Sequence, residues 1–292
     1  MKRAGFKIPL LGVLIWLCSV AAGQSQDTWE SVLKEMDEEG NITFATFKTT
    51  RIANGHSVEQ VKRGVLDVRI NHRFGDVSEG FDNFFGLDNA VTRIGFDYGI
   101  TNGLMIGVGR STLNKEYDGF AKVKLVGQAK KKSPVTVDYL AGMSVISEKI
   151  DIPELKFWNR ASYVHQLLVA RKINESFSLQ VMPTYLHYNL TNLSSEKNNL
   201  FALGFAGRYK ITSRTALTCE YYVVPKDMRR QGNFNPLTIG IDIETGGHVF
   251  QLFVSNASGV TERSLFTATT SRFEKGELHI GFNISRVFTV GR

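Results

Sequence analysis

The amino-acid sequence predicts an all-β fold, a single transmembrane antiparallel β-barrel of about 12 strands behind a short N-terminal extension. Two observations support this prediction. Apolar and polar residues alternate along one segment after another, and the connections between these segments alternate in length. We therefore divide the chain into a signal peptide (1–23), a periplasmic or lumenal N-terminal extension (24–62) and the barrel (63–292).

The beginning of the chain resembles an export signal. Lys2, Arg3 and Lys7 make it basic, residues 8–20 are apolar, and small residues follow at 21–23. This order is typical of a cleaved secretory signal peptide, and the apolar run is too short to span a bilayer comfortably. We expect cleavage after Ala22 or Gly23. The predicted location is the outer membrane of a Gram-negative bacterium.

The extension, residues 24–62, contains apolar residues at helical spacing among acidic ones: Trp29, Val32, Leu33 and Met36. This spacing predicts a short amphipathic helix, which could dock on a periplasmic partner, plug the barrel or pack loosely. Residues 42–50 could also form a strand. Because a barrel of this kind needs an even strand number, a further strand would then lie in 261–270, for 14 in total.

Strict alternation identifies the strands. In residues 65–74, Leu66, Val68 and Ile70 alternate with Asp67 and Arg69. Side chains of a strand alternate between two faces, so one face is apolar and the other is charged. We expect 12 strands, near 65–74, 90–100, 103–112, 119–128, 134–146, 158–170, 176–188, 199–210, 214–223, 236–244, 248–255 and 277–289.

The connections also suit an outer-membrane barrel, which has short periplasmic turns and longer outer loops. Residues 101–103 and 245–247 predict tight turns, whereas 75–89 and 256–276 are long. Loop 75–89 carries Phe81, Phe84 and Phe85, which either bind a partner or fold back into the barrel mouth. A basic loop at 225–235 could contact lipopolysaccharide, although an ordinary solvated loop fits equally.

The polar faces predict a charged lumen with two opposed walls. The charged residues that we assign to the lumen are Arg69, Arg73, Arg93, Lys122 and Lys124 on one wall and Glu220, Asp242 and Glu244 on the other. In one interpretation the walls flank a water-filled constriction that favours small polar solutes. In the other, opposed charges pair across the lumen and close it. A 12-stranded barrel lies in size between small barrels filled with side chains and wide porins, so its size fits either interpretation.

Four stretches resemble one protein family: residues 46–52, 72–75, 247–252 and 281–288, the last of them GFNISRVF. Together they are similar to outer-membrane β-barrel proteins of Bacteroidetes that form a domain family without an assigned function. The resemblance extends from about Phe44 to the end. It implies a barrel and an outer-membrane location, and it implies no catalytic residue, substrate or cofactor.

The remaining chemistry is sparse. The histidines lack metal-ligand spacing and no Gly-x-Ser-x-Gly elbow occurs, so we expect no catalytic, cofactor or metal site. The chain has a net charge of +7, but an exported protein rarely meets nucleic acid, so we expect no nucleic-acid partner. Outer-membrane lipid, lipopolysaccharide and a periplasmic or envelope protein are the expected partners. A narrow passive channel is the first functional hypothesis, a non-conducting scaffold or surface-binding barrel the second, and a membrane-embedded hydrolase the third.

Overall fold

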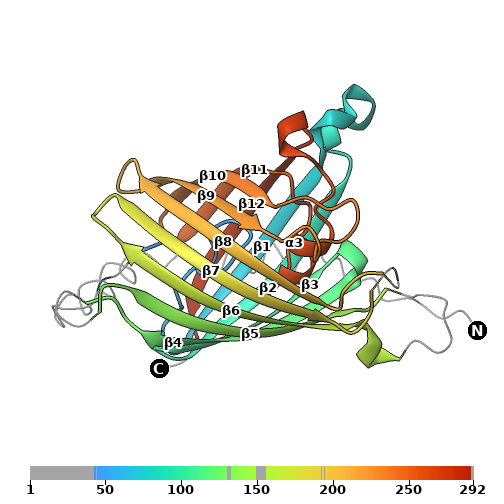
Figure 1. Ribbon diagram of the computed structural model, residues 1–292. Coiled ribbons are helices and arrows are strands. Elements are labelled where there is room, and N and C mark those ends of the chain that lie inside the picture. Colours follow the sequence, from blue (N-terminus) through green and yellow to red (C-terminus); the bar gives the residue numbers. More distant parts are fainter. Residues whose placement is uncertain are drawn as a thin grey trace, which may run out of the picture. The chain divides into compact units, whose positions relative to one another are not determined.

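The computed structural model describes residues 43, 45–129, 133–148, 156–191, 193 and 195–290. The predicted signal peptide and the predicted amphipathic helix lie outside the described residues. Twelve antiparallel strands form a closed barrel in which each strand pairs with its neighbours in sequence and β1 pairs with β12 (Figure 1). The predicted number of strands is confirmed.

The strands agree with the predicted segments to within a few residues. They are β1 (Val65–Asp76), β2 (Ala90–Thr101), β3 (Leu104–Ser111), β4 (Glu116–Val126), β5 (Thr136–Ile146), β6 (Ala161–Lys172), β7 (Phe177–Tyr188), β8 (Asn199–Lys210), β9 (Thr215–Val223), β10 (Leu237–Thr245), β11 (His248–Ser255) and β12 (His279–Thr289). The short helices are η1 (Val77–Glu79), η2 (Phe81–Gly86), η3 (Leu113–Lys115), η4 (Phe157–Arg160), α3 (Glu262–Thr267) and η5 (Phe273–Lys275).

The 14-strand alternative is wrong. Within residues 42–50, the described positions form bends rather than a strand, and α3 occupies most of 261–270. Thr261 caps α3, because its hydroxyl accepts a hydrogen bond from the Ser264 backbone N–H at 3.1 Å. A capped helical turn satisfies its backbone locally and offers no edge to a neighbouring strand.

The connections define two ends of the barrel. We call the end with the β2–β3, β4–β5, β6–β7, β8–β9 and β10–β11 connections the turn end and the other the loop end. One pair departs from the predicted alternation. The β4–β5 connection at the turn end, residues 127–135, is longer than the β3–β4 connection at the loop end, residues 112–115. By the usual orientation of such barrels, the loop end faces the exterior.

The two faces of the barrel wall differ as the alternation predicts. The outward face is apolar and exposed, with examples on many strands: Ile94, Phe96, Val108, Phe201, Leu203, Leu217, Ile239, Leu252 and Ile280. The lumen-facing positions are buried and often polar, as in β1, where Asp67, Arg69, Asn71 and Arg73 are at most 5% exposed. This is the pattern of a barrel surrounded by lipid. Among the described residues, no helix is long and apolar enough to cross a membrane.

Loop 75–89 extends beyond the strands at the loop end (Figure 1). Of the two interpretations of its phenylalanines, the structure supports exposure, since Phe81, Phe84 and Phe85 are 78%, 54% and 47% exposed. Phe84 and Phe85 both have positive φ, of 46° and 56°. That backbone conformation is uncommon for bulky residues.

Gly99 lets the chain enter the barrel wall without a clash. It faces the lumen on β2, and its carbonyl accepts a hydrogen bond from the Gly64 N–H at 2.9 Å. A Cβ at position 99 would lie 2.0 Å from the Lys62 backbone oxygen. Only glycine therefore allows the segment preceding β1 to pass so closely to β2.

We predict that Gly99→Ala destabilises the refolded barrel by about 1–3 kcal/mol, the usual cost of overpacking. Urea unfolding followed by tryptophan fluorescence measures the change. Gly119→Ala is the matched control, because its Cβ would lie 3.6 Å from the Gly107 backbone oxygen, which is an ordinary contact. Equal stability of the two variants would contradict this account of Gly99.

Candidate functional site

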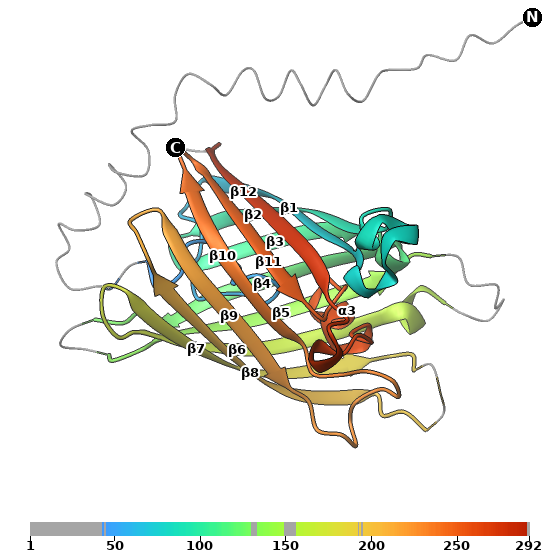
Figure 2. The same ribbon diagram turned by 90° about the horizontal axis from the view of Figure 1, so that it is seen from above.

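The lumen contains a segment of the chain itself. Residues 45–62, which we call the lumenal hairpin, lie inside the ring of strands as the blue trace of Figure 2. Hydrogen bonds from Ile52 N to Gly55 O (2.8 Å) and from Ser57 N to Thr50 O (3.1 Å) hold its turn. Just before it, Thr43 N donates to Gln128 O in the β4–β5 connection at the turn end.

The tip of the lumenal hairpin is held by side chains from several strands. The Glu220 carboxylate accepts the backbone N–H groups of Asn54 at 2.7 Å and Gly55 at 3.0 Å. The Asn54 side chain donates to Thr238 Oγ1 at 2.7 Å and accepts from Arg73 Nη2 at 2.7 Å. Buried backbone groups need such partners, and here β1, β9 and β10 supply them.

The two arms of the hairpin are held in the same way. Lys122 Nζ donates to the carbonyls of Ser57 and Glu59 at 2.9 and 2.6 Å. Gln180 receives the Val58 N–H at 2.9 Å and donates to the His56 carbonyl at 2.7 Å. At the turn end, Lys48 forms an ion pair with Glu244. The lumen wall thus supplies hydrogen bonds to a segment that has few backbone hydrogen bonds between its own two arms.

The hairpin also has an apolar side. Phe47, Ile52 and Val58 are at most 2% exposed and belong to one apolar core with residues of β5–β9. The core residues of those strands include Leu140, Val164, Leu168, Met182, Leu186, Leu200 and Tyr222. Burying an apolar side chain of this size contributes about 1.5–3 kcal/mol. The hairpin is therefore packed into the barrel and not merely placed in a water-filled lumen.

A second insertion comes from the loop end. The β11–β12 loop folds inward, so that α3 places Leu265 and Phe266 in the same core, with Phe266 edge-on to Tyr222 at 5.3 Å. Thr261 donates to Glu116 Oε1 at 3.0 Å and fixes the start of α3 to β4. The two insertions meet at Glu262, whose Oε1 lies 2.9 Å from Arg51 Nη1 and 3.1 Å from His56 Nε2.

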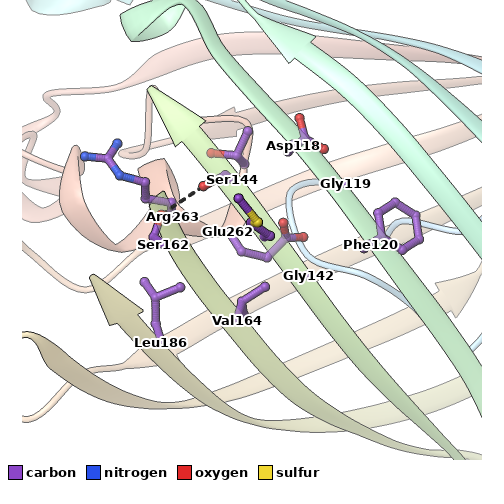
Figure 3. A pocket seen from close by; sticks show the side chains of 12 residues that line it. Asp118, Gly119, Phe120, Gly142, Ser144, Ser162, Val164, Leu186, Glu262 and Arg263 are labelled. Atoms are coloured by element: carbon purple, nitrogen blue, oxygen red, sulfur yellow. Dashed lines mark hydrogen bonds between the residues drawn. The ribbon is translucent and has the colours of Figure 1, made fainter. Parts of the chain in front are cut away.

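A cleft lies between α3 and the lumen face of β4–β7 (Figure 3). It contains about 280 Å³ of unfilled space, counting its open mouth, and Ser144 and Ser162 line it with a hydrogen bond of 3.0 Å between their hydroxyls. Figure 3 shows Glu262 and Arg263 pointing in opposite directions from α3, with Glu262 directed towards Phe120. The part of the cleft that water can occupy measures about 10 Å³, which is room for about one water molecule.

The structure places all eight predicted charges on the lumen side of their strands. Six are at most 3% exposed and two, Lys124 and Glu244, are half-buried near the turn end. Among the described residues, no ion pair joins the two predicted walls. Arg69 pairs with Asp67 at 3.2 Å, Arg93 with Asp118 at 2.5 Å, and Asp242 accepts from Gln251 at 3.0 Å. Most of the other hydrogen-bond and ion-pair partners of the eight charged residues lie in the lumenal hairpin.

Inward glycines make room for these charges. A Cβ at Gly95 or at Gly109 would lie 2.4 or 2.3 Å from the Arg93 guanidinium, so the arginine lies across both residues. In contrast, the predicted basic loop 225–235 is not a simple solvated surface. Arg230 is 7% exposed, covers the Tyr188 ring at 4.7 Å and lies 3.6 Å from Glu196.

Sequence reasoning missed the residues that join the two insertions, Arg51, His56 and Glu262. Their partners are far away in sequence and follow no periodic pattern. One local signal was present, because Asn54-Gly55 is a turn-forming dipeptide and it stands at the hairpin tip. Of the predicted extension, residues 45–62 lie in the lumen.

A serine–histidine pair does form at the loop end, where Ser271 Oγ lies 3.2 Å from His279 Nε2. Ser271 donates to Asp76, and the other ring nitrogen of His279 contacts the Phe74 carbonyl at 3.0 Å. The carboxylate therefore binds the serine and does not orient the imidazole, unlike a catalytic triad. Among the described residues, no group of three or more His, Cys, Asp or Glu side chains could hold a metal ion.

Burial lowers the pKa of the His56 imidazole well below its ordinary value near 6.5, and Arg51 lowers it further. Arg51, Glu262 and Lys122 are the charged groups that act on this ring. In water the released hairpin regains the ordinary pKa. Below pH 6.5 the released hairpin therefore binds a proton that the docked hairpin excludes, and docking becomes weaker as the pH falls.

We predict that changing the pH from about 7.5 to about 5 weakens docking of the hairpin by up to about 2 kcal/mol, at about 1.4 kcal/mol per pH unit. Thiol labelling of Thr46→Cys, in a Cys219→Ser background, measures release of the hairpin, since Thr46 is 2% exposed. In His56→Gln the acid-induced increase in labelling should be lost. An unchanged pH dependence in that variant would assign the effect to other groups.

Comparisons agree with this architecture. A family model described as a membrane bound beta barrel domain (DUF5777) matches residues 47–288. No curated protein sequence matches the chain.

Similar solved structures share 11% identity with the chain. A KdgM porin aligns over 77% of this chain and 99% of its own, with a TM-score of 0.47. An outer-membrane channel of Pseudomonas putida F1 aligns over 79% and 98%, with a TM-score of 0.48. The outer membrane protein Omp33 of Acinetobacter baumannii aligns over 76% and 97%, with a TM-score of 0.43. The family match covers most of the chain, which therefore belongs to the family of membrane-bound β-barrel domains.

Proposed function

We propose that the protein is a passive channel for small polar solutes and that the lumenal hairpin closes it in the state described here. One observation supports this proposal above others. Lumen side chains of β1, β4, β7 and β9 bind the hairpin instead of pairing across the barrel. Withdrawal of the hairpin would leave these groups facing a lumen that water can enter.

The open lumen would carry charges of both signs on different strands. Arg69, Arg73, Arg93, Lys122 and Lys124 come from β1, β2 and β4, whereas Glu220, Asp242 and Glu244 come from β9 and β10. Opposed charged walls create a transverse field, which favours small polar solutes over apolar ones. A 12-stranded barrel is wide enough for such a path once its interior is cleared.

Opening requires the hairpin to leave as a unit. Its buried apolar side chains contribute about 1.5–3 kcal/mol each, and its hydrogen bonds contribute further. Thermal fluctuation alone rarely releases a hairpin held this strongly. A ligand or a periplasmic or envelope partner would therefore supply the free energy of its release. The same packing favours the second candidate function, a permanently closed barrel that serves as a scaffold or a surface-binding component.

The protein would be exported to the outer membrane. Residues 1–23 would direct export and be removed, and the quoted motif resemblance supports an origin in Bacteroidetes. Outer-membrane lipid and lipopolysaccharide would surround the barrel. We propose no catalytic role, because the carboxylate of the Ser271–His279 pair is bound to the serine.

We predict that the refolded protein lacking residues 24–62 conducts in discrete steps in a planar bilayer, whereas the protein that keeps them conducts rarely. Removing the hairpin exposes the polar lumen to water and leaves all 12 strands intact. Heat-dependent mobility on gels checks that both forms are folded. A folded truncated protein that stays silent would refute the channel and leave the scaffold function.

We further predict that charge reversal changes ion selectivity in the truncated protein. Arg93→Glu should shift the reversal potential towards cations and Asp242→Lys towards anions, because both side chains belong to the lumen wall. The exposed Glu274→Lys, in the β11–β12 loop, is the control and should leave the potential nearly unchanged. Equal reversal potentials in all three variants would place the ion path away from these walls.

A further inference from the structure

Arg51 and His56 form a buried pair of nitrogen donors on the lumenal hairpin. They face each other across an isolated β-bridge, and they are 6% and 0% exposed. Both are directed at one oxygen, Glu262 Oε1, at 2.9 and 3.1 Å. The arrangement is that of a carboxylate held by a guanidinium and an imidazole.

The surroundings leave this pair with few other partners. Phe120 forms the apolar side of the site, since its ring lies edge-on to His56 at 4.5 Å and 5.1 Å from the Arg51 guanidinium carbon. Within the described part of the chain, neither ring nitrogen of His56 has a hydrogen bond of good geometry, and Nε2 lies 3.1 Å from Glu262 Oε1. Asp97 also acts on Arg51 electrostatically, and Glu262 is the carboxylate in contact with it. Because a buried cation without an adjacent anion is costly, a carboxylate in this site stabilises the docked hairpin.

That carboxylate comes from a separate element. The hairpin supplies both donors, whereas Glu262 belongs to a loop that enters the barrel from the loop end. Glu262 also lines the cleft beside α3, next to Ser144 and Ser162. A solute that reaches the cleft from the loop end thus arrives beside the carboxylate that Arg51 and His56 hold.

We propose that Arg51 and His56 form a binding site for the carboxylate group of a small solute, and that Glu262 occupies this site in the closed barrel. The inference rests on the proposed channel function and names its substrate class, small carboxylic acids in their ionised form. The Glu262 side chain shows that a carboxylate fits between the two donors. A bound solute would replace Glu262 and separate α3 from the hairpin.

Chemical rescue tests the site without requiring conduction. Glu262→Ala removes the internal carboxylate, and Thr46→Cys in the Cys219→Ser background reports release of the hairpin by thiol labelling. We expect labelling in Glu262→Ala to be about tenfold faster than with Glu262 present, the equivalent of a contact worth about 1.4 kcal/mol. Formate or acetate should restore most of the protection, whereas chloride at equal ionic strength and neutral acetamide should not.

Three matched variants make the result specific. Glu262→Gln fills the space with an amide, so acetate should not slow its labelling. Arg51→Gln combined with Glu262→Ala removes the principal donor and should abolish rescue. Glu274→Ala changes an exposed acid of the same loop and should label slowly, like the protein with Glu262.

Failure of rescue by formate and acetate in folded Glu262→Ala would overturn the carboxylate site. So would equal rescue by acetamide, or rescue that persists without Arg51. None of these outcomes depends on current through a bilayer. A silent truncated barrel would therefore refute the channel separately from the site, and a conducting barrel without rescue would refute the site alone.

Discussion

The structure depends on one constraint, that backbone and charged groups inside a barrel need partners. The lumenal hairpin has two backbone hydrogen bonds that hold its turn, and the wall supplies most of the others: Glu220 at the tip, Lys122 and Gln180 along the arms. The dependence is mutual, since these side chains find their partners in the hairpin while it is docked. Loss of a single partner in the docked state leaves a buried group unpaired, at a cost of about 1–3 kcal/mol.

The interior is divided into two kinds of surface, and the hairpin matches both. The lumen faces of β1, β2, β10 and β12 present polar residues such as Asp67, Arg93, Asp242 and Asn283, whereas the apolar core gathers over β5–β9. The hairpin directs Phe47, Ile52 and Val58 to the apolar core. Its backbone groups bind polar side chains in both regions, among them Asn283, Gln180 and Glu220. This division explains how so many charges stay buried beside an apolar core, because each charge keeps a short-range partner.

Most of the fold could be predicted from sequence, because a strand between lipid and a polar lumen must alternate with period two. The same rule placed all eight predicted charges on the lumen side. It could not find their partners, since Lys122 and Glu220 bind backbone groups of the hairpin, which leave no trace in side-chain periodicity. Nor could it place α3, since a capped single turn is too short to show a helical period. Arg51 and Glu262 are brought together by two separate insertions, and no local pattern links them.

Both arms of the lumenal hairpin begin at the same end of the barrel. Thr43 lies against the β4–β5 connection, and Val65 starts β1 beside the last residues of β12. Within the described residues, the segment is therefore a loop that enters the ring of strands and leaves it at the same end. The ring of strands can close during membrane assembly before its interior is filled, and it can be emptied and refilled later without breaking a single strand pair. The barrel and the lumenal hairpin are therefore topologically separable, although one continuous chain forms both.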